Sequence, residues 1–148
     1  MRCIIKLLKM FKVKYNIINM QIPDSIKEQL KQLFSSIDGI HLAYLFGSQI
    51  TSQKGPLSDY DFAVYFDDNL THVKRNNLTL ELHQKIAKIV KTDAIDLVVL
   101  NQNNNSILKF NIIKDGVLLY QKEPYKVIIE PAIMSEYFDF KQFLDKFI

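Results

Sequence analysis

The segments Leu45-Phe46-Gly47-Ser48 and Asp59-Tyr60-Asp61-Phe62-Ala63-Val64, separated by ten residues, decide how this chain folds. We expect one apolar strand to end at Gly47-Ser48 and a second to begin at Asp59. Because residues i and i+2 of a strand point to the same face, Asp59 and Asp61 should project together. Their repulsion and desolvation favour a bound divalent cation, and Mg²⁺ prefers carboxylate oxygens and substrate phosphates. The backbone N–H groups and the hydroxyl of Gly47-Ser48 suit a nucleotide phosphate.

This pattern of Gly-Ser, ten residues and Asp-x-Asp resembles the signature of the polymerase-β-type nucleotidyltransferases. The short length of the chain and its sequence from Gly55 to Val64 resemble the minimal nucleotidyltransferase (MNT) branch. Many members of that branch are antitoxins encoded beside a HEPN-domain RNase toxin. The resemblance runs from about Pro23 to Ile148. It implies an α/β (α+β) fold with a mixed, mainly antiparallel sheet flanked by helices and a C-terminal helix packed on it.

The competing interpretation is a structural Gly-Ser turn followed by a solvated acidic strand end. Most Asp-x-Asp pairs in proteins are of that kind. Here the pair borders the run Phe62-Ala63-Val64-Tyr65-Phe66, which is apolar enough to be buried on both faces. This context favours the functional interpretation.

Asp96 is the third candidate carboxylate. It is the only charge in the predicted strand from Ile95 to Leu100, and a buried strand carboxylate needs a partner or a metal. If this strand pairs beside the one that begins at Asp59, Asp96 can join Asp59 and Asp61. In the resembled family, a third carboxylate on the neighbouring strand does this. The alternative is a polar strand start that faces solvent.

Composition is that of one globular domain. The chain has 148 residues, of which 48% are hydrophobic and 24% charged, and this is enough for a sizeable core. Cys3 is the only cysteine, so we expect neither a disulfide framework nor a cysteine metal cluster, and we expect a cytoplasmic location. None of the three histidines has metal-ligand spacing, and His72 and His83 are expected on a helix surface. No run reaches the length of a membrane span.

The net charge of +3 comes from the N-terminal residues. Residues 1–20 contain five basic side chains and no acid, whereas the other 128 residues contain 14 basic and 16 acidic side chains. We therefore expect a basic N-terminal extension over residues 1–20 and a near-neutral MNT domain over residues 21–148, without a basic groove for nucleic acid. An alternative for the extension is a basic amphipathic segment that touches a membrane surface.

Periodicity and breaker residues predict the remaining elements. The first helix should begin at Pro23-Asp24-Ser25 with a capping box between Ser25 and Glu28, and end at Gly39 as its C-cap. The predicted strands are His41–Phe46, Asp59–Phe66, Ile95–Leu100 and an edge strand Val117–Tyr120. The other predicted helices are Gln49–Gln53, His72–Lys91, Ser106–Lys114 and Pro131–Phe147.

The last predicted helix is unusually aromatic. Part of its apolar face should cover the sheet, and the excess could either serve a partner or complete the intramolecular core. The sequence leaves both possibilities open.

The resemblance implies attack of a hydroxyl on the α-phosphate of ATP, with two Mg²⁺ ions stabilising the attacking and leaving oxygens. Asp59 and Asp61 would bind both ions, and Asp96 would help to hold one and could accept the hydroxyl proton. Ser48 and the backbone N–H groups of Gly47 and Ser48 would hold the β- and γ-phosphates. Little chain lies beyond the catalytic sheet, so we expect another protein to present the acceptor. This agrees with the resemblance, which implies transfer of AMP to a tyrosine of a HEPN toxin.

One departure and two alternatives accompany this interpretation. Family members often carry Arg-Gly a few residues after Gly-Ser, where this chain has Thr51 and Ser52, and the loss of the arginine puts rate and nucleotide preference in doubt. Lys54 could contact the phosphates, but a solvated loop lysine is the simpler interpretation. The chain could instead modify a small molecule such as an antibiotic, which a tight homodimer with a shared cleft would favour. It could also be an antitoxin that neutralises its partner by binding alone.

Overall fold

The computed structural model describes residues 22–47 and 59–148. Its elements, in chain order, are α2 (Asp24–Ser36), β1 (Ile40–Phe46), β2 (Tyr60–Phe66), α3 (His72–Val90), β3 (Ile95–Val99), the 3₁₀ helix η2 (Leu100–Gln102), α4 (Ser106–Asp115), β4 (Val117–Gln121) and α5 (Tyr125–Phe147). The expected N-terminal extension 1–20 and the helix expected at Gln49–Gln53 lie outside the described residues.

The four strands form one sheet in the order β3-β2-β1-β4. Strand β1 pairs antiparallel with β2 and with β4, and only β2 and β3 run parallel. The mixed, mainly antiparallel sheet is the one that the resemblance implies, and the prediction of an edge strand after Gly116 is confirmed by β4. Side chains that alternate along each strand therefore serve two separate cores.

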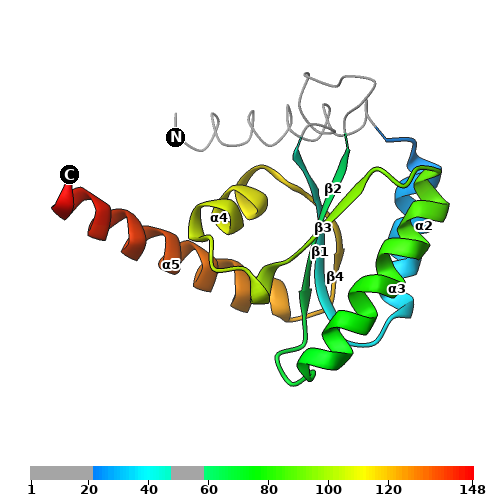
Figure 1. The fold of residues 1–148 in the computed structure, drawn as a ribbon, viewed down its shortest axis with the longest axis horizontal. Helices are drawn as coiled ribbons and strands as arrows, with labels where there is room; N and C mark the ends of the chain where they lie inside the picture. The colour runs from blue at the N-terminus through cyan, green and yellow to red at the C-terminus, as the bar shows by residue number, and fades with distance from the viewer. Residues whose placement is uncertain (1–21, 48–58) are drawn as a thin grey trace, which may run out of the picture.

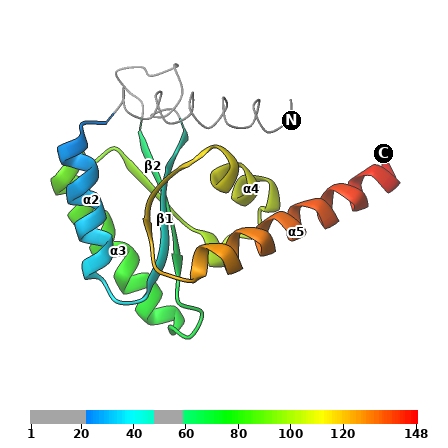
Figure 2. The same cartoon turned by 180° about the vertical axis from the view of Figure 1, so that it is seen from behind.

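Helices cover both faces of the sheet, as Figures 1 and 2 show. Helices α2 and α3 lie on one side, where Phe34, Phe62 and Leu82 are among the buried residues. Helix α4 and the first half of α5 lie on the other side, where the core includes Tyr44 and Ile133. The apolar run in β2 thus serves both cores, as its composition predicts.

The expected caps of the first helix are wrong. Helix α2 begins at Asp24, so Ser25 lies inside the first turn, and among the described residues no side chain caps this end. Proline at the N-cap instead supplies its carbonyl, which accepts from the N–H groups of Ile26 and Lys27. Gly39 lies beyond the C-cap residue Ile37, and its φ of +94° belongs to the turn into β1.

The start of the last helix is also wrong in the sequence analysis. Pro124 is the N-cap of α5, and Pro131 lies inside the helix. A proline there removes one donor to the preceding turn, and the freed carbonyl belongs to Val127, which is exposed and can be solvated. Packing of Ile129 and Ile133 against the sheet holds this first half in place.

The helix α5 extends well beyond the sheet (Figures 1 and 2). The expectation of a C-terminal helix packed on the sheet is therefore confirmed for its first half only. Across residues 22–47 and 59–148, none of the helices combines the length and apolar character needed to cross a membrane.

Candidate functional site

The candidate site lies at the end of the sheet where β1 finishes and β2 and β3 begin. Antiparallel pairing places Phe46, the last residue of β1, opposite Asp61 of β2. Parallel pairing places Asp61 opposite Asp96 of β3. The hydrogen bond from the Tyr60 N–H to the Ala94 carbonyl, at 2.9 Å, fixes the start of this register. Two of the three predicted carboxylates are therefore direct neighbours on adjacent strands.

Asp61 and Asp96 face the α4 and α5 side of the sheet. In β2, Phe62 packs into the core under α2 and α3, whereas Ala63 packs into the core under α4 and α5. Side chains alternate along a strand, so Asp61 shares the face of Ala63, and its register partner Asp96 shares it too. The pairing of β3 with β2 thus meets the condition under which Asp96 was expected to lie beside Asp61.

Asp59 lies just outside the sheet, so strand pairing does not fix its side chain as it fixes Asp61. Asp59 is exposed and immediately precedes the first residue of β2. Asp96 is also exposed, so the premise that it is a buried strand charge is wrong. Its place in the site comes from register, because parallel pairing puts it beside Asp61 whether or not it is buried.

Gly47 is needed for a steric reason that the sequence analysis did not anticipate. Its φ is +79°, and a Cβ built at this position would overlap the Asp61 carboxylate. The missing side chain thus leaves the space that Asp61 occupies. The only sequence signal for this contact is a glycine directly after an apolar strand, followed twelve residues later by the Asp59-Tyr60-Asp61 pair.

The carboxylates suit a hard divalent cation in ligand type. Among residues 22–47 and 59–148, however, no group of three or more His, Cys, Asp or Glu side chains lies close enough to hold a metal ion. The gathering of Asp59, Asp61 and Asp96 around Mg²⁺ therefore stays a prediction. Ser48, Thr51, Ser52 and Lys54 lie outside the described residues.

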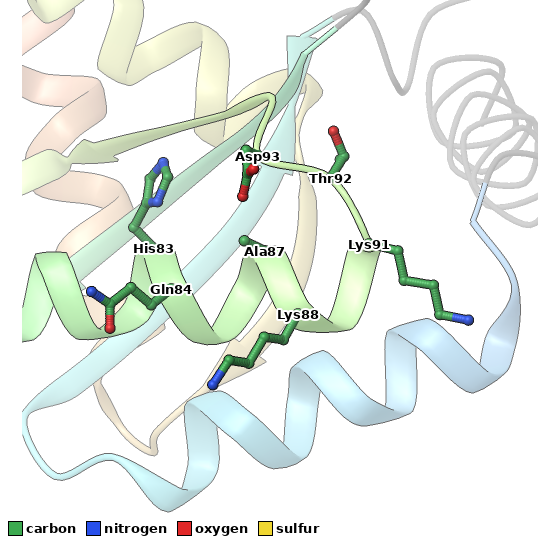
Figure 3. Close-up of a pocket in the computed structure, with 7 residues that line it drawn as sticks. All are labelled: His83, Gln84, Ala87, Lys88, Lys91, Thr92 and Asp93. Atoms are coloured by element: carbon green, nitrogen blue, oxygen red, sulfur yellow. The ribbon is translucent and has the colours of Figure 1, made fainter.

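A pocket of about 400 Å³ lies where α3 ends and the chain turns into β3 (Figure 3). It is lined by His83, Gln84, Ala87, Lys88, Lys91, Thr92 and Asp93. The expectation that His83 is a surface residue is only partly right, because it is half-buried and its Nε2 lies 3.2 Å from the Ile95 carbonyl. No motif indicated this pocket, since its residues share only one side of a helix and a short loop.

Comparison with known proteins supports the fold and the family. Residues 28–125 match the family model described as polymerase beta, nucleotidyltransferase. The protein adenylyltransferase MntA of Aphanizomenon flos-aquae (strain 2012/KM1/D3) is 31% identical over 103 residues, which are 66% of this chain and 67% of the relative.

Two solved structures are similar over most of their length. A chain of a toxin–antitoxin complex with AMP-PNP matches with a TM-score of 0.64 and 24% identity, over 85% of this chain and 95% of that chain. A chain from the complex of a tri-AMPylated Shewanella oneidensis HEPN toxin with an MNT antitoxin matches with a TM-score of 0.63 and 23% identity, over the same shares. At this level of identity the similarity shows a shared fold.

Proposed function

This chain belongs to the polymerase beta nucleotidyltransferase family, and from that premise we propose that it transfers AMP from ATP to a tyrosine hydroxyl of a partner HEPN RNase toxin, which neutralises the toxin. The observation that carries the proposal is the register of Asp61 with Asp96, on one face of the sheet and directly beside Gly47. A relative named as a protein adenylyltransferase, and a similar structure with an AMPylated toxin, support the choice of a protein acceptor.

We assign roles to the site residues as follows. Asp59 and Asp61 would hold two Mg²⁺ ions, and Asp96 would help to hold one of them. When bound, the ions would supply charge stabilisation for the attacking hydroxyl oxygen and for the oxygen of the pyrophosphate that leaves the α-phosphate. Asp96 is exposed and so accessible to an incoming hydroxyl, whose proton it accepts.

The phosphate groups of ATP need a separate set of contacts. Gly47 directly follows β1 and has a positive φ, which turns the chain at the end of the strand. The N–H groups of Gly47 and Ser48 and the Ser48 hydroxyl would hold the β- and γ-phosphates. The chain then contributes mainly positioning and charge neutralisation, as in other phosphoryl transfers.

The direct test is mass spectrometry of the partner. We expect that the purified chain, incubated with ATP, Mg²⁺ and the HEPN protein encoded beside it, raises the mass of that protein in steps of one AMP unit. Chelation of the metal with EDTA should stop the reaction. A partner of unchanged mass, with wild-type protein and intact ATP, would contradict the proposal.

A second candidate is an antitoxin that neutralises its partner by binding alone. The two candidates differ in whether Asp59 and Asp61 are needed for neutralisation.

A further inference from the structure

The exposed C-terminal part of α5 together with Ile148, residues 138–148, is an apolar feature that the proposed reaction does not use. We call it the arm. Its exposed side chains include Phe138, Phe140, Phe143, Phe147 and Ile148. Figure 1 shows the arm running outward past α4, away from the sheet. Exposed aromatic surface of this extent in a globular protein indicates an interaction site.

The apolar side chains of α5 form one stripe whose exposure rises along the helix. Ile129 and Ile133 are 6% and 5% exposed on the sheet, whereas Phe140, Phe143 and Phe147 are 37%, 57% and 73% exposed. Because a helix has 3.6 residues per turn, these positions share one side with Glu136. The stripe that packs on the sheet thus continues beyond it without a covering element among the described residues.

The spacing of the stripe is that of a coiled coil. Ile133, Glu136, Phe140, Phe143 and Phe147 follow at steps of three, four, three and four, which is the a/d pattern of a heptad repeat. In this register Tyr137 and Leu144 flank the stripe on the side of α4, where Tyr137 stacks on Phe110 with 4.0 Å between ring centroids. Asp139 and Lys146 flank it on the opposite side.

The charges of the arm indicate what kind of partner binds it. Asp139, Lys141, Asp145 and Lys146 balance, so the arm has no basic excess to attract a membrane surface or a nucleic acid. In an antiparallel pair of identical arms, Phe140 of one copy meets Phe143 of the other. Asp139 then lies beside Lys146 of the other copy, and two-fold symmetry forms this ion pair twice.

We propose that two copies of this chain associate through an antiparallel pairing of their arms, with the Phe140 and Phe143 rings at the centre and two Asp139–Lys146 ion pairs beside them. We call the contact between the two arms the seam. It lies beyond the sheet, so the second copy does not cover Asp61 and Asp96. It therefore does not create the shared cleft that a small-molecule acceptor would require, and it leaves the proposed reaction with a protein acceptor possible.

Charge reversal in the full-length chain tests the register. The dissociation constant of the dimer is measured by sedimentation equilibrium for wild type, D139K, K146D and the D139K/K146D double variant. Each single variant places like charges together twice and should weaken the dimer about tenfold, whereas the double variant restores both pairs and should return to within about threefold of wild type. Asp139 and Lys146 are both solvent-exposed, so circular dichroism should show an unchanged fold for all variants.

Two phenylalanine variants test the seam. Phe143→Ala removes a central ring and should weaken the dimer about a hundredfold. Phe138→Ala removes a ring that is 49% exposed, contacts Phe110 and Tyr137 of its own chain and lies off the stripe, and it should change the dimer less than threefold. A monomer at about 100 μM wild-type protein would overturn the proposal. A dimer that is indifferent to both the charge reversals and Phe143→Ala would also overturn it, because the contact would then lie elsewhere. If the protein is a monomer and its arm becomes buried only after the toxin is added, the arm binds the toxin and not a second copy.

Discussion

Gly47 meets two requirements at once, because its φ is positive and its missing side chain leaves room for the Asp61 carboxylate. Gly47→Ala should lower the free energy of unfolding by about 1–2 kcal/mol and, by displacing Asp61, should abolish AMP transfer. Gly39→Ala is the matched control, because Gly39 also has a positive φ but lies at the other end of β1, where the nearest atoms belong to the flexible Leu70 side chain.

We expect both alanine variants to lose similar stability in urea unfolding, and only Gly47→Ala to lose transfer of radiolabelled AMP. Equal loss of activity in the two variants would mean that strain, and not the space beside Asp61, explains the glycine.

The paired carboxylates should be needed for their charge and not for their shape. Asp61→Asn and Asp96→Asn keep the side-chain volume but remove a metal ligand, so each should lower kcat about 10²–10³-fold. Asp38→Asn removes the same charge in the exposed turn before β1, at the far end of the sheet, and should leave kcat within about twofold. Rates are measured by transfer of radiolabelled AMP to the partner. A fully active Asp61→Asn variant would remove this residue from the mechanism.

His41 should make stability dependent on pH below neutrality. It is buried, its ring stacks on Tyr125 at 3.4 Å between centroids, and its Nε2 lies 3.8 Å from the Asp67 carboxylate. Burial lowers the pKa of His41, the nearby Asp67 partly opposes this, and Lys122 adds to it. The unfolded chain, with an ordinary pKa of about 6.5, then binds the proton more readily than the folded chain, so stability should fall as pH drops below about 6.5.

The pH dependence is measured as the free energy of unfolding in urea between pH 7.5 and pH 5. His41→Phe keeps a ring against Tyr125 but cannot be protonated, and it should flatten this dependence. His72→Phe, on the exposed start of α3, should leave it as in wild type. A wild-type slope that survives in His41→Phe would assign the effect to another group.

Only those relations within the candidate site that join residues close in sequence could be predicted. The two-residue period of a strand relates Asp59 to Asp61, but register and parallel pairing with β3 are decided by contacts between segments far apart in the chain. The sequence therefore predicts the place of Asp96 only on the condition that β3 pairs with β2, and the predicted burial of Asp96 is wrong because the residue is exposed. The clash at Gly47 and the burial of His41 are also tertiary effects, and neither has a sequence motif.

At the scale of elements, a buried hydroxyl on β1 adds a polar contact to the apolar packing that holds α5 on the sheet. The Tyr44 hydroxyl donates to Glu130 at 2.6 Å, and burial raises the pKa of Tyr44, which keeps this donor protonated. Tyr44→Phe should therefore destabilise the protein by about 1–2 kcal/mol, because Glu130 loses its donor at the base of the helix. The Lys126 ammonium, 3.2 Å from Glu130, limits the loss.

Tyr65→Phe is the control for this prediction. The Tyr65 hydroxyl donates to Asp68 at 3.2 Å in an exposed position, so its removal should cost less than about 0.5 kcal/mol. Urea unfolding of the two variants gives the comparison. Equal losses would show that the hydroxyl of Tyr44 does not anchor α5.

The elements that were predicted correctly are those with strong periodicity. Helix α3, strand β2 and edge strand β4 match their predicted bounds within one residue. The failures occur at proline. The predicted helix begins at Pro131, whereas α5 begins at Tyr125 and contains this proline. Contacts of the turn before Pro131 with β1 compensate for the backbone hydrogen bond that the proline removes. Such contacts depend on the assembled sheet and cannot be inferred from the sequence around Pro131.

At the scale of the whole molecule, the two faces of the sheet have different roles. The α2 and α3 side is closed by apolar packing, whereas the α4 and α5 side carries Asp61 and Asp96 at one end of the sheet. A Lys109–Glu136 ion pair of 2.7 Å and the Phe110–Tyr137 stack join α4 to α5 just before the arm begins. The arm therefore starts from a fixed base, and changes in it should leave the carboxylates in place.

This separation makes it possible to test whether neutralisation needs chemistry. Co-expression of the toxin with the Asp59→Ala/Asp61→Ala double variant should leave cells sensitive to the toxin, because the variant keeps the two apolar cores but lacks two proposed metal ligands. The measurement is growth, with co-purification of the two proteins as the control that the variant still folds and binds. Full neutralisation by the double variant would show that contact alone suffices and would favour the binding antitoxin. Loss of neutralisation with retained co-purification would show that the partner must be modified and not merely covered.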